Sequence, residues 1–193
     1  MSEQRVVIAD ANLSSRKSLK ALLGQAGFMV MGEAEDGLRA LKLIRNRQPD
    51  LVIMDARLAI EDNGRAACIV QEEGLAPLIL LTGPDQLNLR GENSIIRDFA
   101  YVIKPVTEDN LMPVIDLVTR HYRKIRELED EILKLKATLE TRRLVEKAKG
   151  ILMHTMSLTE EEAFKRIQQQ SMNKRVSMKS VARAIILTEE LKV

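Results

Sequence analysis

Residues 49–55 read Pro-Asp-Leu-Val-Ile-Met-Asp, and this stretch decides the fold of the N-terminal part of the chain. A short uninterrupted apolar run between turn-forming residues is typical of a strand that is buried on both faces. Four more apolar runs occur at residues 6–9, 28–32, 78–81 and 100–103. Because helical patterns separate these runs, the sequence predicts an α/β fold, in which a five-stranded parallel, doubly wound sheet is covered on both faces.

The intervening helices are less sharply defined than the strands. A helical pattern ends near Gly27, and others are expected over residues 36–47 and 63–73. Residues 85–97 have no clear pattern.

Polar residues stand where four of the predicted strands end. Asp10 follows the first run, Asp55 follows the third, Thr82 closes the fourth and Lys104 closes the fifth. Functional groups of a parallel sheet gather at the carboxyl ends of its strands. The two carboxylates suit Mg²⁺, and a carboxylate can act as the nucleophile that forms an acyl phosphate. The alternative is that each residue only caps a turn.

The strings Val6–Asp10, Pro49–Asp55, Leu80–Thr82 and Tyr101–Pro105 resemble the receiver domain of bacterial response regulators. The resemblance covers about residues 4–120 and implies a flavodoxin-like fold. It also implies a sensor histidine kinase as partner and Asp55 as the phosphorylation site.

The same resemblance assigns roles around Asp55. It implies that Asp10 and Asp55 bind Mg²⁺, and that Thr82 and Tyr101 form a switch pair. Lys104 would contact the phosphoryl group, and its bond to the following proline would be cis.

The sequence departs from the receiver pattern at Ala11, where the family has a second acidic residue that binds the metal. The loss of one carboxylate predicts weaker Mg²⁺ binding. The segment 56–59 also lacks the usual proline, and residues 98–100 read Asp-Phe-Ala where a Gly-Ala pair is usual. A degenerate receiver that is not controlled by phosphorylation is therefore the alternative.

A seven-residue apolar repeat begins near Leu111 and predicts a coiled coil. Residues 111, 118, 125, 132 and 139 form one row, and residues 114, 121, 128 and 135 form the second. Mostly β-branched residues at the first position with leucine at the second favour a parallel dimer. A long amphipathic helix packed on its own domain is the alternative. The predicted dimer seam consists of Val118, Ile125, Leu128, Ile132, Leu135 and Leu139.

Three helical pieces follow the repeat. The first continues the long helix to Met153, and the second begins with Thr159-x-x-Glu162, a capping box. The third begins near Ser177 and carries an apolar stripe at helical spacing. A basic turn, Asn173-Lys174-Arg175, separates the last two helices.

The string at residues 143–153, Arg-Leu-Val-Glu-Lys-Ala-Lys-Gly-Ile-Leu-Met, followed by Thr159–Phe164, resembles the ANTAR domain. In that family a coiled coil leads into three short helices that bind RNA. The stretch Ser171–Arg175 is most similar to ANTAR regulators of ethanolamine utilisation. We expect a receiver domain over 1–118, a coiled-coil linker over 119–142 and an ANTAR domain over 143–193. The expected RNA contacts are Arg143, Lys147, Ala148, Lys149, Gly150, Lys174 and Arg175.

Charge and composition fit this division. Residues 1–118 hold 13 basic and 17 acidic residues, whereas residues 119–193 hold 17 basic and 11 acidic ones. A basic C-terminal part suggests a polyanionic partner, although solvated helix faces would give the same excess. The chain has no secretory signal pattern and no apolar run long enough to span a membrane, so we expect a cytoplasmic protein.

Together these features predict a transcription antiterminator rather than a turnover enzyme. Phosphorylation of Asp55 would promote homodimerisation, and the dimer would bind tandem RNA hairpins in a leader transcript. A DNA-binding regulator is one alternative, but the last helix ends in Glu189-Glu190 and carries a clean apolar stripe, which disfavours it. A protein-interaction module with a degenerate receiver is the other.

Overall fold

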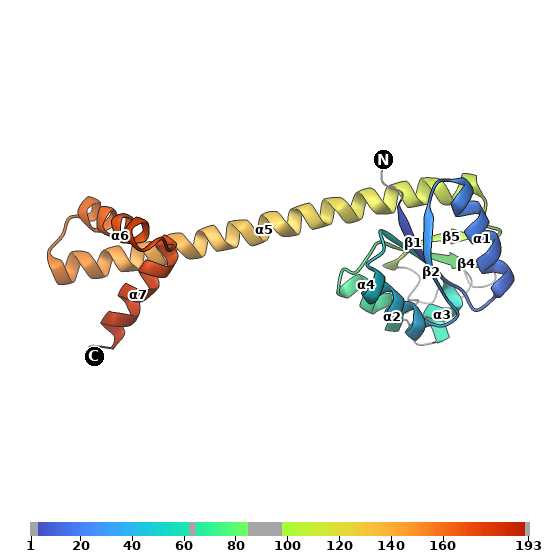
Figure 1. Ribbon diagram of the computed structural model, residues 1–193, viewed down its shortest axis with the longest axis horizontal. Helices are drawn as coiled ribbons and strands as arrows, with labels where there is room; N and C mark the ends of the chain where they lie inside the picture. The colour runs from blue at the N-terminus through green and yellow to red at the C-terminus, as the bar shows by residue number, and fades with distance from the viewer. Residues whose placement is uncertain (1–3, 62–64, 85–97, 192–193) are drawn as a thin grey trace. The chain divides into compact units, whose positions relative to one another are not determined.

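The computed structural model describes residues 4–61, 65–84 and 98–191 (Figure 1). The chain falls into two compact units, Met1–Ile125 and Arg126–Val193, which we call the receiver unit and the helical unit. The boundaries expected at residues 118 and 142 stay predictions.

The receiver unit is built on one five-stranded sheet. All of its paired strands run parallel, in the order β2-β1-β3-β4-β5. The predicted doubly wound α/β fold is therefore confirmed. The strands are β1 (Arg5–Ala9), β2 (Met29–Ala34), β3 (Leu51–Asp55), β4 (Leu78–Thr82) and β5 (Ala100–Ile103).

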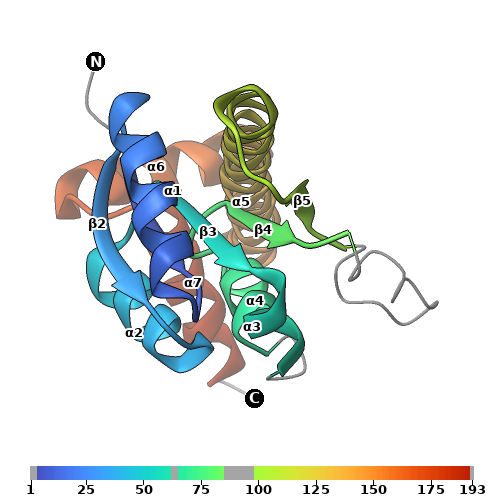
Figure 2. The same ribbon diagram turned by 90° about the vertical axis from the view of Figure 1, so that its right-hand side faces the viewer.

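Helices cover both faces of the sheet (Figure 2). Val52 and Met54 of β3 pack in the core with α2 (Gly37–Arg47), α3 (Ala56–Glu61) and α4 (Arg65–Glu72). Leu51 and Ile53 pack in a second core with α1 (Leu13–Gln25) and the start of α5 (Glu108–Met156). Because neighbouring residues of each strand enter opposite cores, the apolar runs are uninterrupted.

The structure differs from the sequence prediction after β3. The sequence predicted one helix over residues 63–73, whereas the structure has α3 directly after Asp55 and then α4 from Arg65. Helix α3 can form because residues 56–59 contain no proline, and because the Oδ1 atom of Asp55 accepts the backbone N–H of Arg57 at 2.7 Å. Asp55 therefore acts as the N-cap of α3. Residues 85–97 lie outside the described residues.

The helical unit consists of the end of α5, α6 (Glu160–Lys174) and α7 (Met178–Glu190). The predicted capping box at the start of α6 is confirmed, because Thr159 and Glu162 exchange both hydrogen bonds. Ser177 caps α7, as its predicted start required. The core of this unit comprises Val145, Ala148, Leu152, Ala163, Ile167, Val181, Ala182 and Ile186.

Candidate functional site

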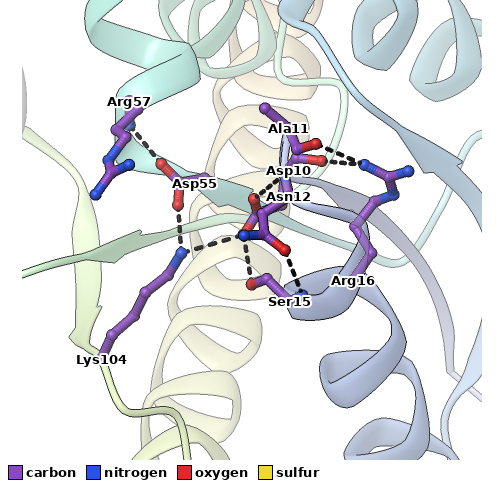
Figure 3. A network of polar contacts seen from close by, with 8 residues as sticks. All are labelled: Asp10, Ala11, Asn12, Ser15, Arg16, Asp55, Arg57 and Lys104. Atoms are coloured by element: carbon purple, nitrogen blue, oxygen red, sulfur yellow. Dashed lines mark hydrogen bonds and ion pairs between the residues drawn. The ribbon is translucent and has the colours of Figure 1, made fainter.

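The carboxyl edge of the sheet brings two carboxylates and an ammonium group together. Asp10 follows β1 and is 3% exposed, and Asp55 ends β3 and is 5% exposed. The Nζ atom of Lys104, which follows β5, lies 3.1 Å from the Oδ2 atom of Asp10 and also forms an ion pair with Asp55 (Figure 3). Both acids are therefore held by the same cation.

Local hydrogen bonds orient the carboxylate of Asp10. Its Oδ1 atom accepts the backbone N–H of Asn12 at 2.8 Å, and its Oδ2 atom accepts the hydroxyl of Ser15 at 2.6 Å. Burial raises the pKa of Asp10, but the hydrogen bonds from Ser15, Asn12 and Lys104 outweigh it, so this pKa lies below its ordinary value. Asp10 is therefore ionised at neutral pH.

The charge of Lys104 is stabilised in the same way. Burial lowers its pKa, but hydrogen bonds and charge interactions with Asp55 and Asp10 outweigh burial and raise it. The site thus holds a charged ammonium group, which can donate hydrogen bonds to the oxygens of a phosphoryl group.

Arg16 holds the backbone on the other side of Asp10 (Figure 3). Its guanidinium donates to the carbonyl oxygen of Asp10 at 2.5 Å and to that of Ala11 at 3.3 Å, and it forms an ion pair with Glu33. Sequence reasoning missed both Ser15 and Arg16. Both residues lie in the first turn of α1, and its N-cap Asn12, whose side chain accepts the backbone N–H of Ser15, is the local signal that could have placed them.

The predicted switch residues lie on the neighbouring strands. Thr82 is fully buried at the end of β4, one residue beyond Leu81, which pairs with Asp55. Tyr101 lies on β5 and is partly buried against the core that contains α2 and α4. The peptide bond between Lys104 and Pro105 is cis, as expected.

Asp10 and Asp55 are the residues that could hold a metal ion. Among the described residues no group of three or more His, Cys, Asp or Glu side chains is placed to do so. Mg²⁺ is nevertheless commonly bound by one or two carboxylates together with phosphate oxygens and water. Asp10 and Asp55 fit such an ion. They provide one carboxylate fewer than the receiver pattern, because residue 11 is alanine.

The predicted dimer seam is largely exposed in the single chain. Ile125, Leu128, Ile132, Leu135 and Leu139 on α5 are between 45% and 64% exposed. Val118, by contrast, packs against the receiver core beside Leu111 and Ile115. The part of the seam that is open to a partner therefore begins at Ile125.

The expected RNA contacts divide into exposed, paired and buried residues. Arg143, Gly150, Lys174 and Arg175 are exposed. Lys147 is exposed and lies 3.0 Å from Glu190. The expectation that Ala148 contacts RNA is wrong for the single chain, because Ala148 is fully buried in the core of the helical unit.

Lys149 is a nearly buried cation of the helical unit. Its side chain is only 8% exposed, and its Nζ atom lies 2.8 Å from Glu146 and 2.6 Å from Glu160. Hydrogen bonds with Glu146 and Glu160 raise the pKa of Lys149. The pairing with Glu160, at the start of α6, could not be read from the sequence, because it depends on how α6 folds back on α5.

None of the helices in the described part of the chain is both long enough and apolar enough to cross a membrane.

Comparisons with known proteins match both units. The family model described as response regulator receiver domain matches residues 6–116, and the model described as ANTAR domain matches residues 133–186. The transcriptional regulatory protein PdtaR of Mycobacterium tuberculosis is 38% identical over 185 residues, which cover 96% of this chain and 90% of that protein.

Two solved structures resemble the receiver unit. The signal receiver domain of a modulated diguanylate cyclase from Desulfovibrio desulfuricans has a TM-score of 0.54 at 20% identity, covering 63% of this chain and 98% of its own. The receiver domain of an HD domain-containing protein from Pseudomonas fluorescens has a TM-score of 0.53 at 25% identity, covering 64% and 99%. The first of these shows the fold alone.

Proposed function

This chain belongs to the response regulators, joining a receiver domain to an ANTAR domain, and on that premise we propose that phosphorylation of Asp55 controls its binding to RNA. The family makes the chain a regulator with an antitermination type of output, not a turnover enzyme. The finer proposal is that a phosphorylated homodimer holds two RNA hairpins of a leader transcript. The resemblance to ANTAR regulators of ethanolamine utilisation remains a prediction from the sequence.

One observation carries the control step. Lys104 contacts both Asp10 and Asp55, which are almost completely buried, at the carboxyl edge of the sheet. In the transfer, a carboxylate oxygen of Asp55 forms the new P–O bond, the P–N bond to the histidine of the kinase breaks, and the imidazole keeps the electron pair. Lys104 then stabilises the negative charge on the phosphoryl oxygens.

Asp10 and Asp55 are the residues that would hold Mg²⁺. The ion supplies positive charge to the phosphoryl oxygens when it is bound. Since Ala11 offers no side-chain oxygen, this chain provides one carboxylate fewer than the family pattern. The concentration of Mg²⁺ needed for phosphorylation should therefore be high for a receiver.

The output step is supported by the exposed seam on α5. Five apolar side chains that repeat at coiled-coil spacing, Ile125 to Leu139, are open in the single chain. The flanking charges fit a parallel pair in register, in which Lys124 faces Glu129 of the second copy and Glu131 faces Lys136. A second copy of the chain is the partner that satisfies both the apolar seam and these charges.

A degenerate receiver is the second candidate, and Ala11 is the observation that favours it. In that case the chain would bind RNA without phosphorylation. A DNA-binding role is less favoured, because Val181, Ala182 and Ile186 of α7 are buried in the core of the helical unit and are not available to read bases.

One binding experiment separates the candidates. The full chain is mixed with an RNA that carries two adjacent stem-loops or with duplex DNA, with and without acetyl phosphate and Mg²⁺. Asp55→Asn serves as the unphosphorylated control. RNA binding that strengthens with acetyl phosphate in the parent alone supports the proposal. RNA binding that ignores both changes supports the degenerate receiver, and binding to DNA alone would refute an RNA-binding output.

A further inference from the structure

The helical unit contains a cavity of about 620 Å³ between the end of α5, α6 and α7. Its floor is apolar and buried, formed by Leu152, Ile167 and Val181. Its volume lies within the range of sites that bind small organic groups. It is separate from the Ala-Lys-Gly segment at residues 148–150, none of which lines it.

Two cations line the cavity from one helix. Arg166 and Lys174 lie on the same face of α6, with Gln170 between them at four-residue spacing. Eight residues of helix put the two cations about 12 Å apart along the axis. Within the described part of the chain neither forms an ion pair. By contrast, Lys165 of α6 pairs with Glu161, and Lys179 of α7 pairs with Glu140.

The lining that α5 and α7 contribute to the cavity offers hydrogen-bond acceptors. The hydroxyl of Thr155 donates to the carbonyl oxygen of Ile151 at 2.8 Å, and that of Thr188 donates to the carbonyl oxygen of Ala184 at 2.8 Å. Their hydrogens are committed to their own helices, so toward a ligand both oxygens can only accept. Glu189 adds a carboxylate to the lining.

An apolar floor, cations from α6 and acceptors from α5 and α7 match one chemical class. A nucleotide has a flat base that can leave water, a phosphate that binds arginine and lysine, and in three of the four bases an exocyclic amino group that donates hydrogen bonds. Loop bases of RNA hairpins are unstacked and can enter such a slot. The low aromatic content of the chain, 3%, does not conflict with this, because aliphatic side chains form the floor.

From these features we infer that the cavity between α5, α6 and α7 binds one amino-bearing base of an RNA hairpin loop, with Arg166 and Lys174 on the flanking phosphates. The inference rests on the proposed RNA-binding function and deepens it. RNA is chosen as the source of the nucleotide because the part of the chain from residue 119 onward carries 17 basic against 11 acidic residues.

The test uses the full chain and an RNA that the parent protein selects from a pool of paired stem-loops with random loops. Ala184→Phe places a ring in the cavity from an exposed position of α7. Leu187→Phe is the matched control, because residue 187 is 58% exposed on the same helix and does not line the cavity. We expect Ala184→Phe to weaken RNA binding about tenfold and Leu187→Phe to leave it unchanged, with equal thermal stability of both variants.

Loop chemistry provides the second measurement. Each loop adenine is replaced in turn by purine riboside, each guanine by inosine and each cytosine by pyrimidin-2-one riboside, to remove the amino group. We expect one loop position at which this change weakens binding to the parent but has no further effect on Ala184→Phe. A loss that is the same in both proteins would overturn the inference.

The cations are tested by the salt dependence of binding. Arg166→Gln should lower the slope of log affinity against log salt by about 1. Lys165→Gln removes the same charge from the adjacent position outside the cavity and should leave the slope unchanged. Excess adenosine monophosphate that occupies the cavity without displacing RNA would overturn RNA as the source.

The two levels of proposal fail in different ways. If the parent selects RNA and both Ala184→Phe and Arg166→Gln bind it as tightly as their controls, the cavity assignment is overturned and the proposed function stands. If no RNA is selected by the parent, both are overturned.

Discussion

A Gly150→Ala substitution should raise the stability of the helical unit while it lowers the affinity for RNA. Gly150 is exposed inside α5, and a Cβ atom added there meets nothing within 4 Å. The substitution therefore adds no clash and removes the helix penalty of glycine, which is about 1 kcal/mol. For a unit of this size the corresponding rise in Tm is about 4–8 °C.

The same methyl group should harm RNA binding if the RNA backbone approaches this face of α5. We expect an affinity loss of about fivefold, which corresponds to about 1 kcal/mol. The assay pairs a thermal melt, followed by circular dichroism, with RNA titration of the same preparations. Ala137→Gly, at an exposed position of α5, is the control for sign and should lower the Tm of the helical unit.

Two results would refute this reasoning. A lower Tm of Gly150→Ala would mean that the face of α5 at residue 150 is not open. A higher Tm with unchanged RNA affinity would mean that no RNA backbone approaches Gly150, and the expected RNA contacts would have to move toward Lys174 and Arg175.

Three further outcomes are expected. Ile132→Lys should give a monomer by light scattering after phosphorylation, whereas Leu133→Lys, at the adjacent exposed position outside the seam, should leave a dimer; a dimer in both would refute the seam. Hydrogen bonds from Lys179 and Arg183 lower the pKa of Glu140 below its ordinary value of 4.5, so the stability that these contacts contribute is present above pH 4.5 and is lost as pH falls further. Glu140→Gln should therefore show less acid destabilisation in chemical denaturation than the parent, and an identical pH profile would contradict the pairing. Ile167→Ala should cost about 2–5 kcal/mol because Ile167 is fully buried, which equilibrium denaturation would measure; a loss well below that range would show that the core can collapse around the missing side chain.

The sheet was readable from the sequence because its strands enter two cores. Residues 51–54 read as an unbroken apolar run for that reason, and the edge strand β2, which is less buried, extended two residues beyond its prediction. Helix α3 was not predicted, because six residues are too few to establish a helical period.

The sequence predicted the main residues of the site, but it did not predict the residues that hold them in place. Asp55 ends β3, whereas Asp10 and Lys104 directly follow β1 and β5, and parallel topology alone brings all three to one edge. The ion pairs of Arg16 with Glu33 and of Glu160 with Lys149 join different elements, so no local pattern reports them. Ala148 is buried because it lies on the face of α5 that packs against α6 and α7. The sequence motif does not indicate which face of α5 this is.

The capping of α3 by Asp55 changes how genetic tests of this regulator should be interpreted. An alanine at position 55 deletes the phosphate acceptor and also the acceptor for the N–H of Arg57, a cap whose loss costs about 0.5–2 kcal/mol. A phenotype of that allele mixes a signalling defect with a folding defect and with lower protein abundance. Asparagine keeps an oxygen that can cap the helix, so an Asp55→Asn allele, with the protein level measured beside it, separates the loss of the phosphate acceptor from the loss of the cap.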